Sequence, residues 1–201
     1  MPTVAGMLRL VELGGGAEIT PANARFFAAP WPVGLHILGS VVFCLLGAFQ
    51  FSAGLRRSKP DVHRVAGRLL VPCGLVAALS GLWMTQFYPS VGFDGRFVDA
   101  LRLVAGSAMA LCLCLGVLAV RKRDILRHRA WMLRGYALGM GAGTQVLTHL
   151  PWFLFSNIRG EPARAMCMAA GWAINLAAAE WLISRERRKL RAWSHRHEQA
   201  Q

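Results

Sequence analysis

Acidic side chains are scarce in this chain, in which ten Asp and Glu residues accompany 23 Lys and Arg residues. Charged residues of both signs make up only 16% of the sequence, whereas 55% of the residues are hydrophobic and the mean hydropathy is +0.39. This composition is far more apolar than a soluble domain needs. The shortage of charge therefore argues against a soluble protein and favours one that lies in a lipid bilayer.

The signature motifs of soluble enzymes are also missing. No nucleophile elbow, P-loop, HExxH motif or dinucleotide fingerprint occurs, so soluble-type hydrolysis and phosphoryl transfer are not supported. The five cysteines fall within apolar runs and form no CxxC pair, and we interpret them as small core residues. The first 30 residues lack the pattern of a cleaved signal peptide, so we expect the first apolar helix to direct insertion.

Long apolar runs are abundant. A helix rises about 1.5 Å per residue and needs roughly 20 mostly apolar residues to cross the hydrocarbon layer. Five segments meet this requirement: 31–55, 65–88, 103–120, 131–155 and 165–183. We therefore predict an all-α polytopic membrane protein, a five-transmembrane-helix bundle. Its transmembrane domain, 31–184, would follow an extracytoplasmic segment, 1–30, and precede a basic cytoplasmic tail, 185–201.

Lys and Arg are distributed unequally over the predicted loops. Seventeen of the 23 fall in 55–68, in 121–134 and in the tail, and the other six lie on the opposite side. The positive-inside rule then places the N-terminus outside and the C-terminus in the cytoplasm. We predict a multi-pass protein of a bacterial inner membrane with the lipid bilayer as its partner. The asymmetry explains the net charge of +13 without nucleic acid.

Two stretches place a histidine and an arginine at the start of an apolar run. His63 precedes Arg68 in the first, and His128 precedes Arg134 in the second. Both stretches lie at predicted cytoplasmic ends of helices. Their similarity is explained about equally well by an internal repeat of the chain and by the general use of positive residues as anchors at the cytoplasmic side. Glu180 is predicted near the same end, and we expect its carboxylate to pair with Arg68 or Arg134.

Four histidines form two predicted pairs at matched depth. His36 and His149 lie near the outer ends of their helices, and His63 and His128 near the inner ends. Two facing imidazoles in a helical bundle can ligate a b-type haem, and nearby glycines let the porphyrin approach the backbone. The alternative is that these histidines are structural and hydrogen-bond carbonyls, Gln145 or lipid headgroups.

Three stretches carry a resemblance to a known family: "HILGSVVFCLLGAFQF", "HRVAGRLLV" and "HRAWMLRGYAL". They resemble the motifs of the bacterial predicted-membrane-protein family called domain of unknown function 2306, over about residues 31–183. His149 departs from the family's pattern. The residues that match are His36, Gln50, Phe51, His63, Arg64, Gly67, Arg68, His128, Arg129, Trp131, Met132, Arg134 and Tyr136. The resemblance implies a membrane protein and brings no activity with it.

Two classes of function follow from these observations. The first is a b-type haem or quinone-linked electron-transfer protein. Its metal ligands would be His36, His63, His128 and His149, and Arg68 and Arg134 would contact haem propionates or a quinone headgroup. The second is a haem-free membrane module, acting as an accessory subunit of a larger complex or as a binder of a lipid or small molecule. Whether the chain is an enzyme stays open.

Overall fold

The computed structural model describes residues 2–198, and for Pro2, Ala53 and residues 193–198 it describes the backbone alone. All regular secondary structure in this range is helical, which confirms the all-α class. Residues 199–201 of the predicted basic tail lie outside the described residues.

Within residues 2–198, four helices are long and apolar enough to cross a membrane. They coincide with the predicted spans 31–55, 65–88, 103–120 and 165–183. These helices are α3 (Pro30–Gln50), α5 (Pro60–Phe87), α6 (Arg96–Arg121) and α10 (Glu161–Glu198). Both α3 and α5 begin with a proline, which is tolerated in the first turn because the N–H there has no partner within the helix.

The fourth predicted span, 131–155, is divided among α7 (Ile125–Gly139), α8 (Gly141–Thr148) and α9 (Leu150–Leu154). None of these three is long enough to be a membrane span by itself, so the count of five spans stays a prediction. The first break falls between two glycines, which are poor helix formers. The second falls just before Pro151, which has no N–H to donate to the preceding turn.

Side chains of α10 satisfy the carbonyl groups that the first break leaves free. Trp172 donates its indole N–H to the Leu138 carbonyl oxygen over 3.2 Å, and the Asn175 amide donates to the Ala137 carbonyl oxygen over 3.1 Å. In a continuous helix these oxygens would accept from the next turn of the backbone. A Cβ atom at Gly141 would lie only 2.1 Å from Nε1 of Trp172, so this approach requires glycine.

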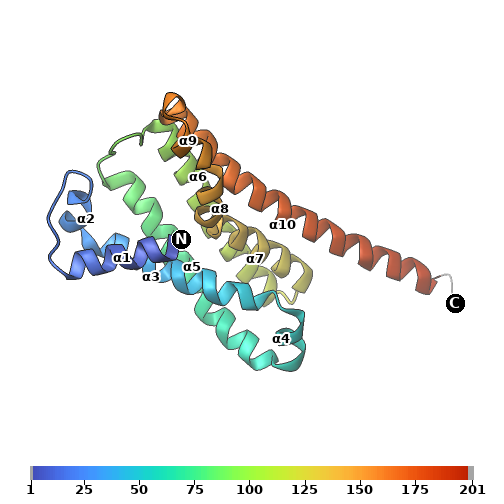
Figure 1. Cartoon of the computed structure of the whole chain (residues 1–201). Helices are drawn as coiled ribbons and strands as arrows, with labels where there is room; N and C mark the ends of the chain where they lie inside the picture. Colours follow the sequence, from blue (N-terminus) through green and yellow to red (C-terminus); the bar gives the residue numbers. More distant parts are fainter. Residues whose placement is uncertain (1, 199–201) are drawn as a thin grey trace.

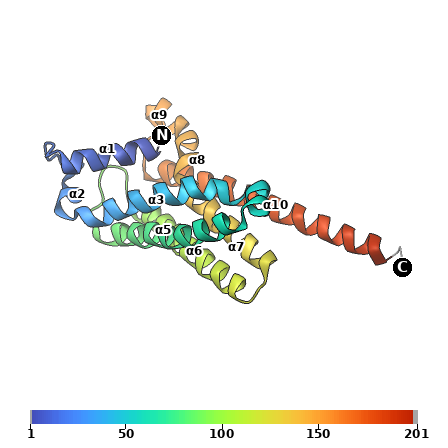
Figure 2. The ribbon, with the colours of Figure 1, turned by 90° about the horizontal axis from the view of Figure 1, so that it is seen from below.

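Successive segments run back and forth, and their connections gather at two ends of the bundle (Figures 1 and 2). One end carries α2 (Ala24–Ala28), the loop after α5, and α9. The other carries α4 (Ala53–Ser58) and the turn between α6 and α7, and the C-terminal part of α10 extends beyond it. We call them the outer and the inner end after the predicted orientation, which itself stays a prediction. Helix α1 (Pro2–Gly14) packs against α3.

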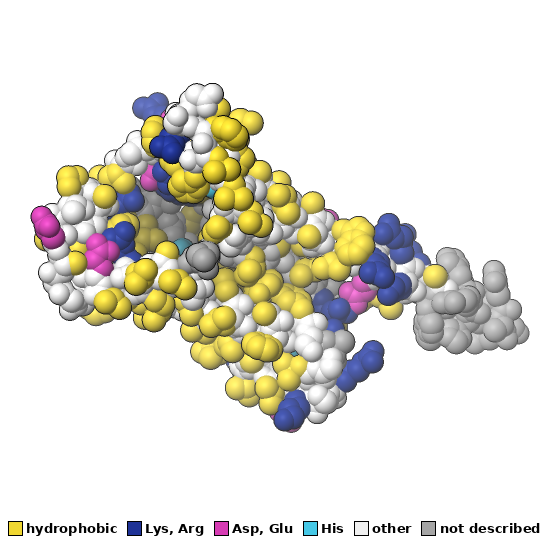
Figure 3. Space-filling model, viewed as in Figure 1, with side chains coloured by type: hydrophobic (Ala, Val, Ile, Leu, Met, Phe, Trp, Pro, Cys, Tyr) yellow, Lys and Arg dark blue, Asp and Glu magenta, His cyan; other side chains and the backbone are white. Residues whose placement is uncertain are grey.

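The core lies where α3, α5, α6 and α7 meet. Phe43 and Leu113 are its most completely buried large side chains, 1% and 0% exposed. Cβ atoms at Gly74 and Gly139 would each lie 2.6 Å from the Phe43 ring, so glycines on two helices leave room for one phenylalanine. Hydrophobic side chains cover much of the outer surface, as a lipid-facing surface requires (Figure 3).

Candidate functional site

A cavity of about 320 Å³ lies in the outer half of the bundle, where Figure 3 shows the molecule hollowed. Its wall comes from α2, α3, α5, α6, α7, α10 and the loop after α5. Polar residues near the helix ends line its outer part, namely Arg25, Tyr88, Ser90, Asp94, Asp99 and Arg102. Mostly apolar residues further along the helices line its floor, among them Ala78, Gly81, Gly106, Leu138, Met168 and Trp172.

His36 of α3 also lines this cavity. Its Nδ1 atom lies 2.8 Å from the carbonyl oxygen of Ala77. Because a carbonyl only accepts, this contact favours the tautomer with the proton on Nδ1 and a lone pair on Nε2. A Cβ atom at Gly81 would lie 3.2 Å from Cε1 of His36, so the absence of a side chain at Gly81 leaves room for the imidazole ring. The imidazole therefore keeps one nitrogen able to accept a hydrogen bond or to bind a metal.

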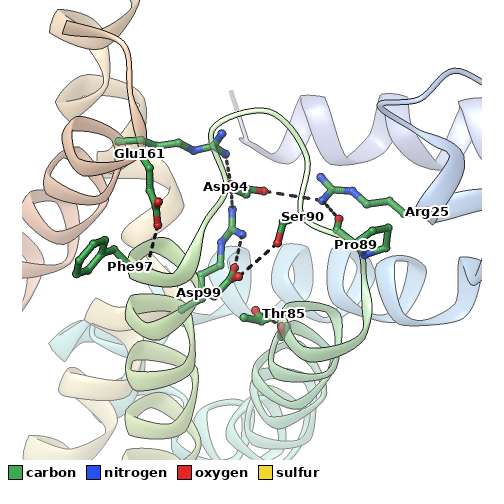
Figure 4. A network of polar contacts seen from close by, with 11 residues as sticks. Arg25, Thr85, Pro89, Ser90, Asp94, Phe97, Asp99 and Glu161 are labelled. Carbon is green, nitrogen blue, oxygen red and sulfur yellow. Dashed lines mark hydrogen bonds and ion pairs between the residues drawn. The ribbon is translucent and has the colours of Figure 1, made fainter.

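Asp94 is a buried carboxylate surrounded by arginines from three helices (Figure 4). Its Oδ1 atom lies 3.0 Å from Arg102 of α6 and 3.0 Å from Arg164 of α10. Arg25 of α2 lies 3.8 Å from Oδ2. The Asp94 side chain is only 3% exposed, so these ion pairs are shielded from water. One loop residue thereby joins three separate helices.

The charges of this cluster do not cancel. Asp99 lies 3.4 Å from Arg102 and accepts a hydrogen bond from the hydroxyl of Ser90 (Figure 4). Together with Asp94, it sets two carboxylates against three guanidinium groups and leaves one positive charge in excess. Because the site is partly shielded, this excess is screened less than it would be in open water. The arginine cluster therefore carries a net positive charge, and four of its members, Arg25, Asp94, Asp99 and Arg102, line the cavity.

Arg25 has the longest contact with Asp94 of the three arginines. Besides its distant contact with Asp94, it donates one hydrogen bond to the Pro89 carbonyl over 3.2 Å. Its Nε atom is buried and has no hydrogen-bond partner among the described residues. Burial lowers the pKa of Arg25 below its ordinary value, and the neighbouring Arg102 and Arg164 oppose the raising effect of Asp94. An additional anion would stabilise this guanidinium.

Aromatic side chains hold α2 at the rim of the cavity. The Arg25 guanidinium lies 4.8 Å from the centre of the Phe26 ring, and Phe26 meets Tyr88 edge-on at 5.5 Å. The Tyr88 hydroxyl donates a hydrogen bond to the Ala29 carbonyl over 2.5 Å. These contacts fix the position of Arg25 relative to the end of α5.

The two predicted outer histidines have different surroundings. His36 faces the cavity from α3, whereas His149 lies at the junction of α8 and α9 and is not among the residues that line it. The His149 Nδ1 atom lies 2.8 Å from the Gln145 carbonyl one turn earlier, and its ring neighbours Phe153. This arrangement agrees with the alternative interpretation, in which His149 is a structural residue that hydrogen-bonds a carbonyl group.

The predicted inner histidines both lie at the inner end of the bundle. His63 is in the first turn of α5 and His128 is in the first turn of α7. The His128 Nδ1 atom lies 2.9 Å from the Gly116 carbonyl, and the His63 Nδ1 atom is buried without a hydrogen-bond partner in the described part of the chain. Because a metal-bound histidine commonly donates its other nitrogen to a carbonyl, His128 has the environment of a possible ligand.

The two predicted anion-binding arginines differ. Arg134 donates to both carboxylate oxygens of Glu180, over 2.9 Å at Oε2, which confirms the expected ion pair. Its guanidinium also lies 4.8 Å from the Trp131 ring. Arg68 is exposed and forms none of the ion pairs found among the described residues. The two arginines therefore do not share a partner, and Arg134 is already occupied by Glu180.

The arginine cluster at Asp94 was not predicted from the sequence. Arg25, Arg102 and Arg164 belong to the minority of basic residues on the predicted outer side, to which the sequence assigns no chemistry. One feature of the sequence could have pointed to this cluster. Acidic residues are scarce in the chain, yet Asp94 and Asp99 lie in one short stretch beside Arg102.

The fold and the cavity define a multi-pass helical membrane protein, with several apolar helices in contact with the bilayer. The chain belongs to a family described as predicted membrane protein, domain of unknown function 2306, whose model matches residues 33–183. This match confirms the family resemblance of the histidine and arginine motifs. No curated protein and no solved structure is significantly similar to the chain.

Proposed function

We propose that this protein binds a small amphiphilic molecule in the outer cavity. The observation that supports the proposal is the division of the cavity wall into an outer part with charged residues and a mostly apolar floor. Ligand sites in proteins are typically concave, of at least about 300 Å³, mostly apolar, and provided with a few convergent polar groups. The cavity of about 320 Å³ meets this description.

The location of the cavity favours a ligand that enters from the membrane interface. Arg25 lies before the first long helix, α3, and Asp94 lies in the loop between α5 and α6. Both are therefore at the depth where lipid headgroups would be. Leu138 lies at the break between α7 and α8, and Trp172 lies about three turns after the start of α10, at the depth of the hydrocarbon. A ligand with a polar head and an apolar body would match both environments. A fully polar solute would find no hydrogen-bond partners at the apolar floor of the cavity. A quinone belongs to this class of molecules.

Filling the cavity tests the proposal. Thr85 lines the cavity from α5, and Thr85→Phe would place a ring in it. Leu79→Phe on the same helix is the matched control, because Leu79 is 57% exposed on the lipid-facing surface. We expect native mass spectrometry of the detergent-purified protein to show a bound amphiphile that is lost in Thr85→Phe and retained in Leu79→Phe. Equal ligand content in the two variants would refute the proposal.

Haem-linked electron transfer is the second candidate. The specific observation in its favour is that His63 and His128 lie in the first turns of α5 and α7, both at the inner end. These two imidazoles would hold the iron, and a bound haem would supply one-electron transfer. His36 could provide one ligand at the outer cavity, but His149 is directed to its own helix. An accessory role in a larger membrane complex stays a prediction.

A further inference from the structure

We infer that the headgroup bound in the outer cavity is anionic, a carboxylate or a phosphate, and that Arg25 is its main contact. This inference rests on the proposed function and specifies the chemistry of its ligand. Asp94 acts as a positioning residue, because it lines the cavity and its Oδ1 atom lies 3.0 Å from Arg102 and 3.0 Å from Arg164.

Arg25 is less closely paired with Asp94 than Arg102 and Arg164 are. Arg102 and Arg164 each have an oxygen of Asp94 within 3.0 Å. Arg25 reaches Asp94 only at 3.8 Å, and its buried Nε has no partner among the described residues. A guanidinium presents its donors in a planar fork that suits carboxylate and phosphate oxygens. Of the two arginines that line the cavity, Arg25 therefore has the weaker pairing, and its guanidinium is the one we expect to contact a further anion.

The charge of the cluster discriminates between kinds of headgroup. Three guanidiniums and two carboxylates leave one positive charge, which a monoanion would neutralise. A cationic headgroup would add to the excess, and Asp99 does not offer it a free carboxylate because Arg102 and Ser90 already contact it. A neutral headgroup would leave the excess charge in place. An anion is therefore the best match.

The test compares ligands that share a tail and differ in the head. Octyl phosphate, octan-1-ol, octylamine and inorganic phosphate are each titrated by calorimetry into the full chain in a non-ionic detergent. We expect octyl phosphate to bind most tightly and Arg25→Gln to weaken it about tenfold or more, because a hydrogen bond to a charged group is lost. Arg25→Lys keeps the positive charge but loses the planar arrangement of donors. Its affinity for octyl phosphate should therefore lie between those of the wild type and Arg25→Gln.

Arg159→Gln is the matched control. Arg159 is also an arginine of the outer end, but it donates to the carbonyl oxygens of Trp152 and Phe153 and is not among the cavity-lining residues. We expect its variant to bind octyl phosphate like the wild type. Thermal unfolding of each variant in the same detergent establishes that it is folded, and Arg25→Lys keeps the test valid if Arg25→Gln fails to fold.

The possible failures are distinguishable. If octan-1-ol bound as tightly as octyl phosphate and Arg25→Gln weakened neither, the anionic headgroup would be wrong while the amphiphile-binding function stood. If inorganic phosphate bound as tightly as octyl phosphate, the anion site would be supported and the amphiphilic class overturned. If none of the four bound and Thr85→Phe also had no effect on ligand content, both the inference and the proposed function would be wrong.

Discussion

The indole N–H of Trp172 lies 3.2 Å from the carbonyl oxygen of Leu138, so a side chain of α10 replaces a backbone hydrogen bond that the break before α8 removes. Both residues also line the outer cavity. The interrupted helix, the close approach of α10 and the cavity floor are therefore parts of one arrangement. Non-helical backbone at membrane depth is tolerated only where protein groups or a cavity satisfy it, and here both are present.

Trp172→Phe tests this relationship. The substitution keeps an aromatic side chain but removes the indole donor from the Leu138 carbonyl, which should lower the free energy of unfolding by about 1–3 kcal/mol. Trp181→Phe is the control, because Trp181 is 56% exposed on the same helix. Thermal unfolding in detergent should show a clear loss only for Trp172→Phe. Similar losses in both variants would mean that the hydrogen bond is not what stabilises the break.

Two glycines should respond to alanine in opposite directions. A Cβ atom at Gly47 would lie 2.2 Å from the Tyr136 ring, whose hydroxyl donates to the Cys44 carbonyl over 3.0 Å. Gly47→Ala should therefore destabilise the protein by about 1–3 kcal/mol through overpacking. A Cβ atom at Gly67 would meet nothing within 4 Å, so Gly67→Ala should stabilise α5 by about 0.5–1 kcal/mol. Parallel unfolding curves would check both, and equal effects would contradict this packing.

Asp94→Asn should expose the mutual repulsion of the three arginines. Removing one partner of a buried ion pair costs about 3–5 kcal/mol, and we expect less here because the three arginine side chains are 19–29% exposed. Octyl phosphate should restore part of the lost melting temperature by supplying the missing negative charge. Asp61→Asn is the control, because that carboxylate is 87% exposed. A loss that octyl phosphate does not reduce would argue against an anion site.

Most of the fold could be predicted because it follows from apolar run length. The long helices α3, α5, α6 and α10 coincide with uninterrupted runs, and the pairing of Glu180 with an inner arginine follows from the cost of an isolated charge in the membrane. The breaks in the fourth run could not be predicted in the same way. The break after α7 depends on Trp172 and Asn175 of another helix, which donate to the Leu138 and Ala137 carbonyls, and this compensation is invisible in the local sequence.

The candidate site was harder to predict than the fold. Arg25, Arg102 and Arg164 lie far apart in the chain and meet only because α2, α6 and α10 converge at Asp94. By contrast, the histidines attract notice at once because an imidazole in an apolar run is costly. Their depth could be estimated from the sequence, but the direction of each ring depends on the rotation of its helix, which gives His36 and His149 different surroundings.

The fourth span can be tested by labelling the loops on either side of it. If α7, α8 and α9 together cross the bilayer, Lys122→Cys should be labelled from the inside and Asn157→Cys from the outside by a membrane-impermeant maleimide, in a chain whose five native cysteines are replaced by alanine. A cysteine inserted after Gln201 should also be labelled from the inside, as the positive-inside rule requires. Labelling of positions 122 and 157 from the same side would show that the interrupted segment does not cross.

The last prediction concerns the histidines at the inner end. If His63 and His128 ligate a haem, the detergent-purified protein should show a Soret band that is lost in His63→Ala and in His128→Ala. His149→Ala should keep the band, because the structure gives that ring a partner in its own helix. If the pair serves only as structure, no band should appear, and His63→Ala should have a smaller effect on stability than His128→Ala. The reason is that His128 contacts the Gly116 carbonyl at 2.9 Å, whereas the His63 Nδ1 atom has no hydrogen bond to lose among the described residues. A spectrum without a Soret band, from protein produced with excess haem, would exclude haem ligation at this end.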